Sequence, residues 1–185
     1  MKHPEARIRT EMAEITVELF PEQAPNTVAS FIRLAREGVF DGQSISRIVP
    51  GFVIQPFFLE EDERMNVIIA NESTAFGFDN TLPFVRGTVA MGAAEDMASG
   101  SSFFFTLTDE AGERLNGRFP AFGLVRTGFE ELDRIEHLEL KEWTDPALPE
   151  NVKVFIPAKP ERILSITVET WGDEYPEPVY LSPET

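Results

Sequence analysis

The 185-residue sequence contains no cysteine, and this absence excludes several kinds of chemistry. Disulfide bonds, zinc–thiolate sites and cysteine nucleophiles all require a thiol. Histidine is nearly as scarce, with His3 close to the N-terminus and His137 in a charged stretch. Two isolated histidines offer little material for a histidine-based metal site or a catalytic triad, so we interpret both as surface residues. No metal or organic cofactor is expected.

Basic residues are also few, since 16 Lys and Arg stand against 32 Asp and Glu, which gives a formal net charge of −16. A chain of this charge is repelled by nucleic-acid backbones and by anionic membranes, so neither is expected as a partner. No apolar run approaches the roughly 18 residues that a membrane span needs, and residues 1–14 lack the apolar centre of a signal peptide. We therefore expect a monomeric, cytoplasmic protein, and its length suits one domain.

Apolar residues recur with the period of short strands in most of the chain. Two amphipathic helices are predicted, over 25–36, where Pro25 suits a first helical position, and over 129–137. Many strands and only two helices favour an antiparallel barrel or sandwich, and we prefer a barrel because closure removes sheet edges. The predicted strands are 7–10, 15–19, two within 46–55, 67–70, 86–91, 121–126 and 164–168.

Three stretches are expected outside this framework. The four adjacent acids of 60–63 are interpreted as a solvated loop, because consecutive carboxylates do not converge on one ion. Segment 143–160 contains four prolines and is interpreted as a surface excursion. Beyond a domain of residues 1–171, the acidic, proline-rich tail 172–185 is expected to lie on the surface or to be disordered.

An unusual combination lies in residues 46–55, where Arg47 and Gln55 are embedded in an otherwise apolar run. Pro50-Gly51 marks a turn, so the flanking strands bring Arg47, Phe52 and Gln55 onto one face of a hairpin. Two interpretations of Arg47 remain open from these residues alone. It is either a functional cation on an apolar wall or a structural arginine tied to one of the many carboxylates.

The run Phe103-Phe104-Phe105 divides its side chains between two faces of a strand. Phe103 and Phe105 share one face, while Phe104 points the other way. We therefore expect at least one of these aromatic side chains to face opposite the core pair. For Phe104 itself, a place in the core is equally compatible with the sequence.

The order of several motifs resembles that of the cyclophilin-type peptidyl-prolyl cis-trans isomerases, over roughly residues 7–170. Each motif is weak alone, and their common order makes the resemblance strong. The segments that carry it are Leu19-Phe20-Pro21, Ala24-Pro25-Asn26-Thr27-Val28, residues 47–55, residues 86–91, Gly100-Ser101-Ser102-Phe103-Phe104, Leu115-Asn116-Gly117 and Phe122-Gly123.

The resemblance implies a closed eight-stranded antiparallel β-barrel with two capping helices, and rotation about X-Pro bonds of peptides or unfolded proteins as the activity. Arg47 would be the catalytic arginine. Gln55 and the backbone at Ala93 would hold the peptide. The proline pocket would be lined by Phe52, Met91, Phe104 and Leu115, with Phe119 at its border.

The chain departs from the family pattern mainly around the expected groove. Ser46, Ser102, Arg114 and Phe119 replace the usual His, Gln, Trp and His, Ala93 replaces an Asn, and Pro56-Phe57 replaces Gly-Gly. We expect retained isomerase chemistry, altered peptide preference and weak binding of cyclosporin. Two alternatives are a proline-peptide-binding or chaperone-like module with weak or no catalysis, and an interaction domain in which Arg47 is structural.

Overall fold

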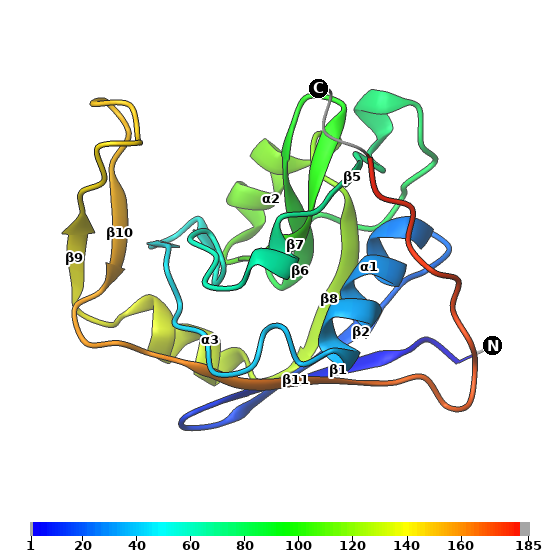
Figure 1. Cartoon of the computed structure of the whole chain (residues 1–185), viewed down its shortest axis with the longest axis horizontal. Coiled ribbons are helices and arrows are strands. Elements are labelled where there is room, and N and C mark those ends of the chain that lie inside the picture. Colours follow the sequence, from blue (N-terminus) through cyan, green and yellow to red (C-terminus); the bar gives the residue numbers. More distant parts are fainter. Residues whose placement is uncertain (1, 182–185) are drawn as a thin grey trace.

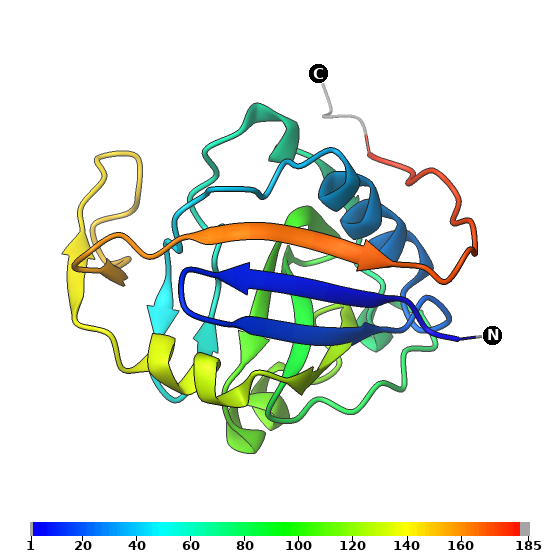
Figure 2. The same ribbon diagram turned by 90° about the horizontal axis from the view of Figure 1, so that it is seen from below.

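The computed structural model describes residues 2–181, in which nine strands form one mainly antiparallel, strongly curled sheet (Figure 1). The strand order is β11-β1-β2-β8-β6-β7-β4-β3, and β5 pairs with β7 as well. Figure 2 shows β11, β1 and β2 side by side along one wall. The strand bounds are β1 Glu5–Thr10, β2 Glu14–Leu19, β3 Ile48–Val49, β4 Val53–Ile54, β5 Ile68–Ala70, β6 Thr88–Ala94, β7 Met97–Thr106, β8 Ala121–Thr127 and β11 Ile163–Glu169.

The sheet is an open half-barrel, so the prediction of a closed eight-stranded barrel is wrong. The end strands β3 and β11 are not neighbours in the strand order of the described chain. The segment before β3, residues 42–45, makes an isolated bridge from Ser44 to Arg162 and three backbone hydrogen bonds to the start of β11 and the residues before it. These are Gly42 N to Ile163 O at 2.8 Å, Ile163 N to Gln43 O at 2.9 Å and Ile45 N to Glu161 O at 2.8 Å. Strand β3 has only two residues, because the turn at Pro50-Gly51 follows at once, and so it offers too few backbone groups for a full ladder.

Residues 2–181 contain three α-helices, one more than predicted. The helices α1 (Pro25–Arg36) and α3 (Phe129–Glu136) lie where the sequence predicts them. The seven-residue α2 (Asp109–Leu115) was not predicted; its first turn is capped by Thr108, whose hydroxyl accepts a 3.0 Å hydrogen bond from Ala111 N. None of these helices is long and apolar enough to cross a membrane.

A distant carboxylate caps α1, which has no side-chain cap of its own at Ala24. Both the backbone N–H and the hydroxyl of Thr27 donate 2.7 Å hydrogen bonds to Glu72, and Asn26 N donates to the second oxygen at 3.3 Å. A negative charge at a helix N-terminus satisfies free N–H groups and complements the helix dipole. Glu72 is buried, so this cap fixes α1 to the loop that follows β5.

The sheet separates two apolar clusters, as alternation within the phenylalanine run predicts. Phe103 and Phe105 belong to the main core inside the curl, with Phe31, Phe40 and Phe122. Phe104 belongs to a smaller cluster on the opposite face, with Val53 and Leu115. The side chain of Phe104 is therefore available to a different surface.

The proline-containing excursion is partly regular, because it carries a second, two-stranded sheet. Strand β9 (Leu140–Trp143) pairs with β10 (Val154–Pro157) in an antiparallel hairpin. We call this hairpin, residues 140–157, the arm; it stands apart at the left of Figure 1. Its prolines did not prevent strand formation because Pro157 ends β10 and Pro146 and Pro149 lie in the connecting loop.

The described part of the tail, residues 172–181, is draped over α1 and β5. Asn26 and Val179 exchange two hydrogen bonds of 2.8 Å, and Leu181 N donates to Ile68 O at 2.8 Å. The hydroxyls of Ser30 and Tyr180 are hydrogen-bonded at 3.0 Å. The last four residues of the predicted tail lie outside the described residues.

A charge cluster fastens α3 to the chain that precedes β11. Arg134 is ion-paired with Glu131 and with Glu161, and Thr10 donates a hydrogen bond to Glu131. The Glu131 side chain is only 2% exposed, whereas that of Arg134 is 31% exposed. Hydrogen bonds to Glu131 and then to Glu161 raise the pKa of Arg134 above its ordinary value.

Candidate functional site

Arg47 lies just before β3 with its guanidinium held by a neighbouring amide instead of a carboxylate. Its Nη1 donates a 3.0 Å hydrogen bond to Gln55 Oε1, and the guanidinium carbon lies 5.4 Å from the ring centre of Phe58. No ion pair connects Arg47 to a carboxylate among residues 2–181. Partial burial lowers the pKa of Arg47, yet a guanidinium stays protonated at physiological pH. The interpretation of Arg47 as a carboxylate-bound structural residue is therefore wrong.

The amide that holds Arg47 is itself fixed from the other side. Gln55 Nε2 donates to Ser102 Oγ at 3.1 Å, and Ser102 N donates to Ser99 Oγ at 2.8 Å. Gly92 leaves the space that Gln55 needs, because a Cβ at this position would lie 2.9 Å from Nε2. Three separate strands thus orient one arginine.

Around Arg47 the structure has a cavity of about 470 Å³, which we call the Arg47 cavity. Phe104 and Phe119 pack edge to face in its wall, with ring centres 5.6 Å apart. The hairpin of β3 and β4, strand β7 and helix α2 all contribute to it. The lining residues are Arg47, Phe52, Val53, Gln55, Phe58, Glu60, Gly92, Ala93, Ser99, Ser102, Phe104, Leu115 and Phe119.

All but one of the residues expected to form the site surround this cavity. Arg47, Phe52, Gln55, Ala93, Phe104, Leu115 and Phe119 line it. Met91 does not, because it is fully buried in the main core opposite Phe103 on β7. Paired residues on adjacent strands share a face, so Met91 points into the curl with Phe103, and its predicted place in the pocket is corrected.

Sequence reasoning missed several lining residues, and strand alternation could have predicted one of them. Val53 alternates with Ile54, which packs in the main core, so strand parity alone assigns Val53 to the cavity side. Phe58 and Glu60 follow the strand in an irregular segment, where periodicity gives no direction. Ser99 lies six residues before the part of β7 that pairs with β4, so it reaches the site because β7 is ten residues long.

Some of the departures from the family pattern turn out to lie away from the cavity. Ser46 is buried, where its hydroxyl donates to Pro56 O at 3.0 Å and accepts from Leu59 N at 2.8 Å. Phe57 is fully buried in the main core and stacks on Phe40 with ring centres 5.0 Å apart. These two replacements therefore contribute to packing and to the backbone hydrogen bonds of residues 56–59. The changes that face the cavity are Ala93, Ser102 and Phe119.

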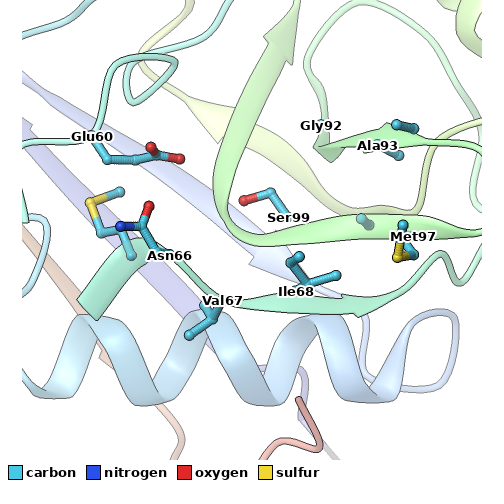
Figure 3. A pocket seen from close by; sticks show the side chains of 11 residues that line it. Glu60, Asn66, Val67, Ile68, Gly92, Ala93, Met97 and Ser99 are labelled. Carbon is cyan, nitrogen blue, oxygen red and sulfur yellow. The ribbon is translucent and has the colours of Figure 1, made fainter. Parts of the chain in front are cut away.

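A second cavity of about 400 Å³ adjoins the first, and we call it the side cavity (Figure 3). It shares Glu60, Gly92, Ala93 and Ser99 with the Arg47 cavity. In Figure 3 the Glu60 and Asn66 side chains lie at one end, and Met97 lies at the other. Desolvation by the surrounding protein raises the pKa of the Glu60 carboxyl.

Comparison with known proteins shows the family of this chain. The sequence profile of the family described as cyclophilin type peptidyl-prolyl cis-trans isomerase/CLD matches residues 6–155. The chain belongs to the cyclophilin family. Among its curated relatives, a probable peptidyl-prolyl cis-trans isomerase of Brucella suis biovar 1 is 31% identical over 131 residues, which are 66% of this chain and 66% of that protein.

Two further comparisons concern a longer relative and a solved structure. A putative bifunctional phosphatase/peptidyl-prolyl cis-trans isomerase of Streptococcus pyogenes serotype M6 is 38% identical over 101 residues, 55% of this cyclophilin and 22% of that protein. The crystal structure of a Cryptosporidium parvum cyclophilin, determined in the presence of the dipeptide Ala-Pro, superposes with a TM-score of 0.71 at 22% identity. That match covers 90% of this chain and 99% of the other, and it confirms the cyclophilin fold.

Proposed function

We propose that this cyclophilin is a peptidyl-prolyl cis-trans isomerase with Arg47 as its catalytic group. The observation that carries the proposal is a permanently charged guanidinium that no carboxylate neutralises within the described chain, beside an apolar cavity. A charge in a partly dry site loses hydration free energy, and no ion pair in the described chain compensates Arg47 for this loss. A function that uses the charge explains why it is kept.

The reaction requires no covalent intermediate. A peptide bond resists rotation by about 18–20 kcal/mol because the nitrogen lone pair is delocalised into the carbonyl. A quarter turn breaks this delocalisation and leaves the lone pair on the prolyl nitrogen. An N–H of Arg47 donates to that lone pair only in the twisted state, so it stabilises the transition state more than either ground state.

The remaining groups bind and orient the peptide in this proposal. Phe52, Phe104, Leu115 and Phe119 form an apolar wall for the proline ring, while Gln55 keeps the guanidinium aimed into the cavity. Apolar surroundings also strengthen the hydrogen bond from Arg47, because water competes less. The Ala-Pro dipeptide of the structurally similar protein supports a proline-containing ligand. Weak cyclosporin binding, a monomeric state and a cytoplasmic location stay predictions from the sequence.

The direct test compares prolyl isomerisation of a four-residue peptide by the wild type and by Arg47→Ala. Loss of one preorganised donor lowers kcat by about 10²- to 10³-fold. Arg7→Ala is a matched control, because Arg7 lies on β1 outside the Arg47 cavity and its ion pair with Glu5 is exposed. Its rate should stay within about threefold of the wild type. Equal rates for Arg47→Ala and the wild type would reject the catalytic assignment.

A proline-peptide-binding module with little catalysis is the second candidate, and the replaced groove residues Ala93 and Ser102 are the reason to keep it. Such a module binds proline peptides without accelerating the exchange between cis and trans. Exchange measured by NMR on a bound peptide separates the two functions. Binding with an unchanged exchange rate would favour the module.

A further inference from the structure

A third cavity lies between the arm and the body of the protein, and it adjoins the Arg47 cavity. We call it the arm cavity; its volume is about 290 Å³. Glu60 lines both cavities, so the two share this residue in their walls. The arm cavity is mainly apolar, with Ile45, Leu59, Trp143, Ile156, Pro157 and Pro160 in its walls.

The arm presents Trp143 on one face and Phe155 on the other. Trp143 pairs with Val154 and therefore shares a face with it, whereas Phe155 pairs with Glu142 on the opposite face. Both aromatic side chains are 39% exposed, but only Trp143 lines the cavity. Indole rings combine a large apolar surface with few rotatable bonds, which makes them efficient binding groups.

The geometry points to the arm cavity as a second binding site for an unfolded client polypeptide, which places an apolar side chain there while its X-Pro bond lies at Arg47. The inference rests on the proposed isomerase function for its substrate class. It follows from the wall residue Glu60 that the two cavities share and from the sizes of the cavities. A volume near 300 Å³ is at the lower limit of small-molecule pockets, so it suits one large side chain of an extended chain.

Charge at the boundary of the two cavities favours the same occupant. Neither Glu60 nor Glu61 forms an ion pair with a residue of the described chain, while Lys141 contributes a positive charge to the wall. With a net charge of −16, the surface favours clients with basic residues next to their apolar ones. Two contacts on one chain also raise affinity, because the second forms within the same complex.

The first experiment measures kcat/KM of wild type, Trp143→Ala and Phe155→Ala on two substrates. One is a four-residue proline peptide whose other residues are small, so that it offers no large apolar side chain to the arm cavity. The other is a reduced, carboxymethylated protein whose refolding is limited by one prolyl bond. We expect Trp143→Ala to lose about tenfold or more on the protein, mainly through KM, and less than about twofold on the peptide. Phe155→Ala should resemble the wild type on both, and Trp143→Phe should restore most of the loss.

The second experiment detects binding without catalysis. The sequence has two tryptophans, so Trp171→Phe leaves Trp143 as the only indole. Titration with a tryptophan-free, carboxymethylated unfolded protein should shift the emission of Trp143 to shorter wavelength and saturate, with or without Phe155→Ala. If the four-residue peptide shows no catalysis while this shift persists, the isomerase proposal fails and the binding site stands.

Two results would overturn the inference. The first is an equal effect of Trp143→Ala and Phe155→Ala on the protein substrate. The second is an emission shift that grows with the concentration of the cyclophilin itself and needs no client, because a second copy would then occupy the cavity.

Discussion

Arg47 and Arg134 are both partly buried arginines, but their hydrogen-bond partners differ in charge. Arg134 is enclosed by Glu131 and Glu161 and joins α3 to the start of β11. Arg47 has only the neutral amide of Gln55, and its cavity is otherwise mainly apolar. The pKa of Arg134 is raised by its partners, while that of Arg47 is lowered by desolvation. Both arginines are partly buried and only Arg134 has carboxylate partners, so the contrast supports the role proposed for Arg47 in binding or catalysis.

The largest effect is expected when the structural arginine is removed. Arg134→Ala leaves Glu131 buried without its cation, and we expect a loss of about 2–3 kcal/mol in the free energy of unfolding. Urea denaturation measures it, and activity per folded molecule on a short proline peptide should not change. The double variant Glu131→Gln/Arg134→Met is the control, because it removes both charges and should recover part of the loss. Full stability of Arg134→Ala would contradict a structural role.

The difference between the two arginines can also be removed by placing a carboxylate next to Arg47. Gln55→Glu places a negative charge next to the guanidinium, which then resembles Arg134. We expect kcat on a short proline peptide to fall about 10- to 30-fold, because the paired donor competes less well for the prolyl nitrogen. Thermal stability should not fall. Gln23→Glu is the control, because it adds the same charge outside the Arg47 cavity and keeps an oxygen to accept from Thr81 N; its kcat should stay within about threefold of the wild type. Equal kcat for Gln55→Glu and wild type would show that the free charge of Arg47 is irrelevant.

The smallest effect concerns Glu60, an acid without a cation among the described residues. Glu60→Gln should reduce the preference for lysine over glutamate next to the X-Pro unit by up to about fivefold, as expected of an exposed ion pair. The measurement is kcat/KM over a set of matched peptides, with Glu63→Gln as a control outside the three cavities.

Acidification gives an independent check of the same residue. Because desolvation raises the pKa of Glu60, this carboxyl takes up its proton at a higher pH than an ordinary glutamate. The preference for lysine should therefore fade as the pH falls through the acid range and persist at neutral pH. A preference that Glu60→Gln leaves intact at neutral pH would exclude Glu60 as its source.

Local patterns predicted the parts of the fold that depend on neighbouring residues. The bounds of α1 follow from Pro25 and Gly38, and the hairpin of residues 46–55 follows from its turn and its flanking apolar residues. The open sheet was not predictable in this way, because pairing between β3 and β11 depends on residues more than 100 positions apart. Helix α2 has only seven residues, too few for a clear period.

In the site, too, local sequence patterns predicted some residues, while others depend on contacts between distant parts of the chain. Motif order brought Arg47, Gln55 and Phe104 together correctly, but it misplaced Met91, although alternation with Ala90 already assigns Met91 to the core side with Val89. Glu60 lies in an irregular segment and Trp143 ends strand β9, and only the folded chain brings both to the arm cavity. That Arg47 has no carboxylate partner in the described chain is likewise visible only in the fold, since any Asp or Glu of the sequence could have formed an ion pair with it.

Strand β7 contributes side chains both to the main core and to the wall of the Arg47 cavity. One backbone ladder fixes Phe103 and Phe105 inside the curl and Phe104 outside it. A shift of the pairing by one residue would exchange the two sets, and would bury the wall of the Arg47 cavity while exposing the centre of the core. Insertions or deletions within β7 therefore cannot alter ligand preference alone. Changes of specificity must come from substitutions on the outer face or from the loops that surround it.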